Sequence, residues 1–128
     1  MRRYLALDVG DRRIGLAVGD EQGGIARALR TLRRRNVDAD VAAIGDIARQ
    51  EEVTALLIGL PLTLRGDEGH QAARVRRFAD ACASLGLPIE MCDERFTTSE
   101  AGLRGFADPD AGAASVLLED FLRARGHA

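Results

Sequence analysis

The sequence has no lysine and no tryptophan, and only 4% of its residues are aromatic. Its two cysteines, Cys82 and Cys92, are not in the C-x-x-C spacing of a zinc or redox motif. We therefore expect two reduced, buried thiols rather than a disulfide or part of a zinc site. Long apolar runs are also lacking: residues 55–64, the uncharged stretch near the middle, have half of the roughly 20 residues that span a membrane.

A secretory signal is not expected either. Arg2 and Arg3 precede a short apolar stretch that ends at Asp8, which is too short for the apolar region of a signal peptide. We expect a cytoplasmic protein without membrane association. The chain has 128 residues, of which 46% are hydrophobic and 30% charged, so we expect one core and a single domain over residues 1–128.

Charge is spread unevenly along the chain. The formal net charge of −2 excludes the strongly basic composition of many nonspecific nucleic-acid binders. All 18 basic residues are arginine, which suits phosphate oxygens, although a GC-rich genome favours arginine codons as well. Nine arginines and four acids lie in residues 1–35, a balance of +5, whereas residues 36–128 carry −7. The early clustering of positive charge is therefore the informative feature.

Hydrophobic periodicity and turn residues predict five strands and three helices. The strands are expected over residues 4–9, 14–18, 25–32, 53–60 and 88–92, and the helices over 37–50, 71–85 and 110–123. Gly10, which can adopt a positive φ, is expected in a hairpin turn between the first two strands. Asp38 or Asp40 is expected to cap the first helix, and Gly86 to end the second. Three strands followed by alternating helices and strands predict an α/β protein.

Asp8 interrupts the first apolar strand. A buried carboxylate without a partner costs several kcal/mol, so a cation or a hydrogen-bond donor is expected near it. Two interpretations are open: Asp8 begins the following turn and bonds its own backbone, or it is a metal ligand.

Glu94 follows the strand expected over residues 88–92, where open α/β sheets present residues to ligands. It is a candidate ligand, with an ion pair to Arg95 on a solvated loop as the alternative. Thr97 and Glu100 have the spacing of a capping box, which favours a helix cap over a catalytic hydroxyl.

Asp108, Pro109 and Asp110 precede the last apolar helix. Asp108 is expected as its N-cap and Pro109 in its first turn, where the helix dipole also favours the charge of Asp110. If Asp8, Glu94 and Asp110 converge, they form an oxygen-only cluster suited to Mg²⁺ or Mn²⁺ rather than to zinc. Two such ions about 4 Å apart can activate a water and stabilise the departing oxygen in displacement at phosphorus.

Four motifs occur in order along nearly the whole chain. They are residues 7–18 (LDVGDRRIGLAV), residues 58–62 (IGLPL) with Gly66, residues 93–98 (DERFTT), and Asp110 followed by Ala113, Ala114, Leu117 and Leu118. In these motifs the chain resembles the pre-16S rRNA nuclease family, also described as Holliday-junction-resolvase-like, within the ribonuclease H-like superfamily. The ordered combination is far more specific than any one motif.

The resemblance implies a ribonuclease H-like α/β fold, a five-stranded mixed sheet whose first three strands form an antiparallel meander, with helices on both faces. It places the family's catalytic, metal-binding acids on Asp8, Glu94 and Asp110. The implied function is metal-dependent hydrolysis of phosphodiester bonds in 5′-end processing of pre-16S rRNA during ribosome biogenesis. The implied partners are a nucleic acid (rRNA precursor or DNA) and ribosomal particles, and the implied cofactor is Mg²⁺ or Mn²⁺, as two ions.

Relatives in this family usually carry a longer Lys/Arg-rich loop before the last helix, whereas residues 102–109 here offer only Arg104. We expect arginines in or beside the motifs to bind the substrate backbone instead: Arg12, Arg13, Arg65 and Arg95. Residues 33–35, three further arginines, either extend this track or form a solvated turn. The low aromatic content favours recognition of the backbone over base stacking.

Other functions are weighed against this one. A structure-specific DNA nuclease in recombination or repair and a non-catalytic nucleic-acid-binding module are both open alternatives. Sugar-kinase and actin-like proteins share an Asp-x-Gly hairpin but need two domains, and no Walker-type loop is present. His70 is expected to be exposed and outside the site. Phe96, Phe106 and Phe121 are expected in the core rather than an interface, and a monomer or weak homodimer is expected.

Overall fold

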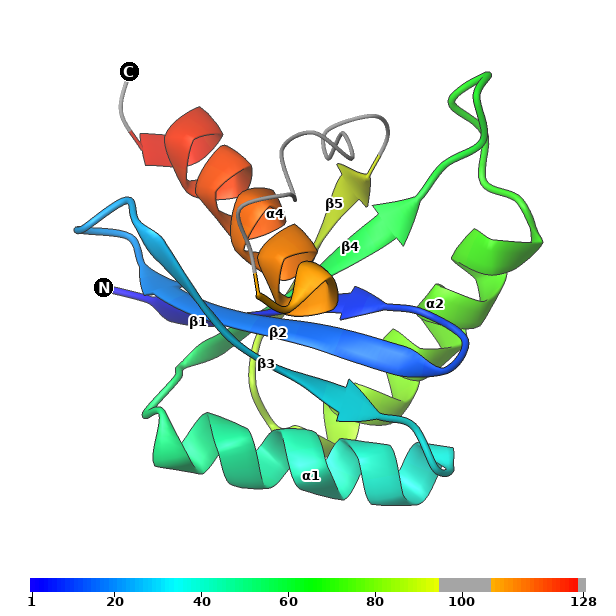
Figure 1. Ribbon diagram of the computed structural model, residues 1–128, viewed down its shortest axis with the longest axis horizontal. Helices are drawn as coiled ribbons and strands as arrows, with labels where there is room; N and C mark the ends of the chain where they lie inside the picture. The colour runs from blue at the N-terminus through cyan, green and yellow to red at the C-terminus, as the bar shows by residue number, and fades with distance from the viewer. Residues whose placement is uncertain (95–106, 127–128) are drawn as a thin grey trace.

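The computed structural model describes residues 1–94 and 107–126 (Figure 1). In chain order the elements are β1 (Arg3–Val9), β2 (Arg13–Asp20), β3 (Ala26–Arg33), α1 (Val37–Gln50), β4 (Ala55–Pro61), α2 (His70–Cys82), a 3₁₀ turn (Ala83–Leu85), β5 (Ile89–Glu94) and α4 (Pro109–Gly126). Each predicted strand and helix is present, with ends that differ by a few residues.

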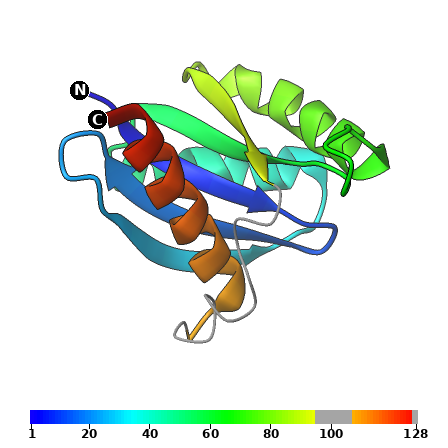
Figure 2. The same ribbon diagram turned by 90° about the horizontal axis from the view of Figure 1, so that it is seen from above.

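The five strands form one mixed sheet in the order β3-β2-β1-β4-β5. The first three are antiparallel, and β1, β4 and β5 are parallel. α1 and α2 cover one face of the sheet and α4 covers the other, as Figure 2 shows from above. The predicted meander and the helices on both faces are thereby confirmed.

Strand alternation divides the core between the two faces. In β1, Leu5, Leu7 and Val9 pack toward α1 and α2, whereas Tyr4 and Ala6 pack toward α4. Each large aliphatic side chain buried in this way contributes about 1.5–3 kcal/mol to folding. Asp8 follows Tyr4 and Ala6 in the same alternation, so its carboxylate is on the α4 face of the sheet.

Several predicted details are wrong. The N-cap of α1 is Asn36, whose side chain accepts a hydrogen bond from the amide of Ala39, and neither Asp38 nor Asp40 caps the helix. By contrast, the predicted hairpin turn at Gly10 is present: the Gly10 amide donates a 2.8 Å hydrogen bond to the Arg13 carbonyl, and Gly10 itself has no positive φ. β4 begins at residue 55 rather than 53 and includes Pro61.

Other predicted details are confirmed. Gly86 follows the 3₁₀ turn after α2 with a φ of 76°, a left-handed conformation that glycine adopts without strain. Cys82 and Cys92 are both free thiols, Cys82 buried and Cys92 half-buried. Burial raises the pKa of Cys82 to about 11 and that of Cys92 to about 12, so neither is a reactive thiolate at neutral pH. None of the helices described is both long and apolar enough to cross a membrane.

Candidate active site

Two of the predicted acids lie at the carboxyl ends of parallel strands. Asp8 is the second-last residue of β1, and Glu94 is the last residue of β5 rather than a loop residue beyond it. β4 separates these two strands, with Leu7 paired to Ile58 and Gly59 paired to Cys92. Because side chains alternate along strands, Asp8, Gly59 and Glu94 all face α4.

Gly59 leaves the space in which the two acids meet. A Cβ atom at this position would lie 2.8 Å from Oε2 of Glu94 and 2.9 Å from a methyl carbon of Leu117. Any larger residue would therefore push the Glu94 side chain away from β4 or displace α4. The sequence contains the signal for this contact in the IGLPL motif, but spacing alone does not show what the glycine makes room for.

The Asp8 and Glu94 side chains lie close to each other, with the Glu94 carboxyl group above Gly59, and are near enough for a hydrogen bond between the two carboxyl groups. Burial, the charge of Asp8 and this hydrogen bond raise the pKa of Glu94 to about 8. Burial also raises the pKa of Asp8; the hydrogen bond from Glu94 opposes the rise and the charge of Asp110 adds to it. At neutral pH Glu94 thus keeps its proton next to Asp8.

Asp110 reaches the site from the first turn of α4. Gly15, which pairs with Asp8 on the neighbouring strand, lets this turn approach the sheet, because a Cβ atom there would lie 1.9 Å from the Asp110 carbonyl oxygen. Asp108 caps the helix as predicted, accepting a 3.3 Å hydrogen bond from the Ala111 amide and another from the Thr31 hydroxyl. These contacts, above all the one from Thr31, lower the pKa of Asp108.

The three acids line one open hollow of about 380 Å³, together with Arg13, Gln71 and Pro61. Arg13 forms an ion pair with Asp110, its Nε 2.9 Å from Oδ2. Across residues 1–94 and 107–126, no three His, Cys, Asp or Glu side chains are grouped closely enough to hold a metal ion as they stand. The acids share a site, but Asp110 is turned toward Arg13 rather than toward the Asp8–Glu94 pair.

A second hollow of about 780 Å³ adjoins the first and shares Arg13 with it. Six arginines line it: Arg12, Arg13, Arg33, Arg34, Arg35 and Arg74. Residues 33–35 thus lie beside Arg12 and Arg13 in the fold. Arg74 of α2 was not singled out by sequence, because its place in a helix pattern gives no sign that it faces the β1–β2 turn.

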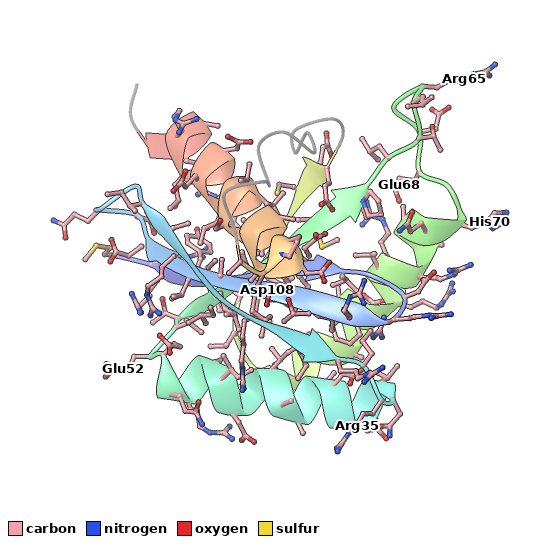
Figure 3. All side chains as sticks on the ribbon, viewed as in Figure 1. Arg35, Glu52, Arg65, Glu68, His70 and Asp108 are labelled. Carbon is pink, nitrogen blue, oxygen red and sulfur yellow. The ribbon has the colours of Figure 1, made fainter. Side chains whose placement is uncertain are left out.

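A third predicted arginine, Arg65, lines neither hollow. Arg65 lies at the tip of the loop between β4 and α2, as Figure 3 shows. This loop is folded back on itself by a 2.8 Å hydrogen bond from the Thr63 amide to the Asp67 carbonyl and is held by an ion pair between Glu68 and Arg76. Arg95, the fourth predicted arginine, lies outside the described residues.

Further predictions concern residues around the site. His70 is exposed at the start of α2 and points away from the fold, as predicted (Figure 3). Phe121 is half-buried and packs edge-on against Tyr4, with ring centroids 5.2 Å apart. Thr97, with its capping partner Glu100, lies outside the described residues, as do Phe96 and Phe106.

Comparison with known sequences gives consistent matches. A family model described as RuvX, Holliday junction resolvase, matches residues 2–124. A protein of Chloroflexus aurantiacus named "Putative pre-16S rRNA nuclease" is 42% identical over 132 residues, covering 94% of this chain and 86% of that protein. A protein of the same name from an Anaeromyxobacter species is 42% identical over 134 residues, covering 96% and 98%.

Solved structures match over nearly the same extent. RuvC of T. thermophilus, solved in complex with a Holliday junction substrate, has a TM-score of 0.66 at 15% identity, covering 98% of this chain and 96% of that one. The resolvase of Fowlpox virus has a TM-score of 0.53 at 8% identity, covering 95% and 97%. At such identities the likeness shows the fold, and it confirms the expected ribonuclease H-like architecture.

Proposed function

Because the chain belongs to the RuvX family, whose relatives carry the name of a pre-16S rRNA nuclease, we propose that it is a divalent-metal-dependent nuclease that processes the 5′ end of pre-16S rRNA. The observation that carries this proposal is the convergence of Asp8, Glu94 and Asp110 on one open hollow. Three separate elements supply these acids, and two glycines make room for them. A fold that buries carboxyl groups beside each other raises their pKa values, which is typical of functional sites.

The donor set fits Mg²⁺ or Mn²⁺. All three candidate ligands are carboxylates, and hard divalent cations prefer such oxygen ligands. The proton that Glu94 keeps next to Asp8 neutralises one of the negative charges that a bound cation would otherwise balance. When bound, two such ions would activate a water and stabilise the departing oxygen at phosphorus.

Arg13 links the acids to the substrate. Its guanidinium is held by Asp110 at 2.9 Å and is itself exposed, so a phosphodiester entering the hollow meets this group first. An arginine that turns from a carboxylate to a phosphate exchanges one charge-assisted hydrogen bond for another. We propose that this exchange frees Asp110 to join Asp8 and Glu94, which completes the set of ligands only when substrate is present.

The family description also favours a second substrate class, branched DNA. Carboxylate clusters of this type act on any phosphodiester that the surrounding surface admits, so the surface and not the acids selects the polymer. Ribosomal precursor particles are the partners implied by the first substrate and recombination intermediates by the second.

Cleavage assays on matched substrates test the proposal. End-labelled RNA that spans the 5′ maturation site of 16S rRNA, DNA of the same sequence and a four-way DNA junction are incubated with Mg²⁺, Mn²⁺ or EDTA. We expect metal-dependent cutting of the RNA near the mature 5′ end. Preferential cutting of the junction would favour the DNA alternative, whereas binding without cutting of any substrate would leave a non-catalytic binding module.

A further inference from the structure

The larger hollow, lined by six arginines and called the basic hollow below, contains one arginine, Arg34, that is held in place by several contacts. Arg34 is only partly exposed and forms an ion pair with the buried Asp40 at 3.2 Å. The same guanidinium donates a 3.0 Å hydrogen bond to the Gly10 carbonyl and lies 4.8 Å from the centre of the Phe78 ring. Asp40 also accepts a 3.0 Å hydrogen bond from the Arg35 amide. Arg34 is thus a structural residue that joins the β1–β2 turn to the start of α1.

Backbone hydrogen bonds bring Arg12, Arg13 and Arg33 together around Arg34. The Arg34 amide donates a 2.9 Å hydrogen bond to the Arg12 carbonyl, and Arg13 pairs with Arg33 across β2 and β3. Two distant segments of the chain, the β1–β2 turn and the end of β3, therefore present their side chains together. Figure 1 shows this turn between the ends of β4 and β5 and the start of α1.

The basic hollow carries positive charge in excess. Arg74 is paired with Asp11 at 3.0 Å, and Arg13 with Asp110. Within the described part of the chain, the guanidiniums of Arg12, Arg33 and Arg35 have no carboxylate partner. Arg35 points out from the start of α1 in Figure 3. A folded protein with a net charge of −2 thus concentrates unneutralised positive charge at one place next to its acids.

The lining of the hollow identifies the ligand class. Apart from charged residues it contains Thr31, Asn36 and Val37, and no aromatic side chain. Bases would find no stacking surface there, whereas phosphate oxygens would find several guanidinium donors. Arg13 lines both hollows, so one continuous polynucleotide can occupy the two at once.

We propose that this basic hollow binds, without regard to sequence, the sugar-phosphate backbone of the nucleic-acid segment that flanks the bond to be cut. Arg33 and Arg35 contact phosphates away from the acids, and Arg12 contacts those nearer to them. The proposal rests on the proposed nuclease function for the identity of the polymer. It adds an anchoring site beside the three acids.

Binding measured without cleavage tests the proposal. The affinity for fluorescein-labelled single-stranded RNA of mixed sequence, and for DNA of the same sequence, is determined by fluorescence anisotropy in EDTA at several salt concentrations. The test variant is Arg33→Gln with Arg35→Gln. The control is Arg30→Gln with Arg77→Gln, which removes the same charge from two exposed arginines that line neither hollow.

We expect the test variant to bind both strands at least about tenfold more weakly than wild type. The slope of the logarithm of the binding constant against the logarithm of the salt concentration should become shallower by about 1.4, or about 0.7 for each lost phosphate contact. The control variant should lose much less affinity for either strand. Equal losses in both variants, or no binding by the wild-type protein, would overturn the proposal. Unchanged melting temperatures of both variants exclude unfolding as the cause of any loss.

Two further arms distinguish a polynucleotide track from the acid site and from a small-anion site. If wild type binds through Arg33 and Arg35 but cuts no substrate, the proposed nuclease function fails while the anchoring site stands. If inorganic phosphate at millimolar concentration displaces the strand fully, the hollow is a small-anion site and the proposal of a polynucleotide track is wrong.

Discussion

In the folded, cation-free protein Glu94 keeps its proton at neutral pH, because burial and the neighbouring Asp8 raise its pKa to about 8. The ordinary pKa of a glutamate is 4.5, so between these two values the folded state binds more protons than the unfolded state. Stability must then fall as the pH rises through this window, in the absence of a divalent cation. At neutral pH the raised pKa of Glu94 therefore lowers the free energy of unfolding of the cation-free protein, relative to a glutamate with an ordinary pKa.

Glu94→Gln should remove this cost. Glutamine keeps a hydrogen-bond donor toward Asp8 and carries no charge, so we expect the variant in EDTA to be more stable than wild type at pH 8 by at least about 1 kcal/mol. Near pH 4.5 the difference should vanish. Chemical unfolding at a series of pH values measures it. Asp93→Asn, at the exposed neighbouring residue, is the control and should keep the wild-type slope.

At the scale of elements, two glycines decide how the site is assembled. Gly15 and Gly59 lie on the strands that flank β1, one on each side of Asp8. The first admits the N-terminal turn of α4 and the second admits the Glu94 side chain. Neither adopts a positive φ, so their role is to provide space rather than an unusual backbone conformation.

Gly59→Ala should therefore impair catalysis through Glu94. The added methyl group meets Glu94 and Leu117 at less than 3.0 Å, and overpacking of this kind costs about 1–3 kcal/mol of stability. We expect cleavage to fall further than stability explains, when assayed well below the melting temperature. Gly23→Ala in the β2–β3 turn, where a methyl group would lie 3.3 Å from an Asp20 side-chain oxygen, is the matched control. Equal activity of the two variants would contradict the role of Gly59.

The opposite end of α4 is held by ion pairs and hydrogen bonds to the half-buried Glu90 at the edge of the sheet. Glu90 of β5 accepts hydrogen bonds from the Tyr4 hydroxyl at 2.8 Å and from Arg2 at 2.7 Å, and it also bonds Arg125 of α4. Burial alone would raise the pKa of Glu90, but Tyr4 and the arginines outweigh it and lower the pKa. This cluster holds the helix whose first turn carries Asp110.

Glu90→Gln should lower stability by about 1 kcal/mol at neutral pH, because a charge-assisted hydrogen bond becomes a neutral one. Since the folded-state pKa lies below the ordinary value of 4.5, the contribution of the charge is present above that value and is lost as the pH falls through the folded-state pKa. Unfolding of wild type and variant at pH 7 and pH 3 tests this. A difference of the same size at both pH values would contradict it.

At the scale of the whole molecule, much of the architecture was predictable from sequence. The β1–β2 hairpin, the continuous apolar run of β4 and the stripe of α4 have clear periodicity, and together they predict the mixed sheet. Asn36 was missed as a cap because Asp38 and Asp40 are equally good cap residues by type. Asp40 is instead buried against Arg34, a contact between side chains that no local pattern reveals.

The candidate site was only partly predictable. Asp8 and Glu94 are conspicuous because acids interrupt or end apolar strands, and Asp110 because it begins a helix. Their meeting depends on the strand order β1-β4-β5, which a sequence pattern does not specify. Arg74 was missed for the same reason, since its ion pair with Asp11 joins residues that are far apart in the chain.

The central claim is that Asp8 belongs to a carboxylate site that binds a divalent cation and cuts a phosphodiester. Cleavage of the end-labelled precursor RNA by wild type, Asp8→Asn and the exposed-helix control Asp46→Asn, each with Mn²⁺ and with EDTA, tests it most directly. Loss of Lewis-acid stabilisation is worth several kcal/mol, so Asp8→Asn should be at least about a hundredfold slower than wild type. The control should cut normally, and EDTA should abolish cutting. Undiminished cutting by Asp8→Asn, or cutting that persists in EDTA, would contradict the claim.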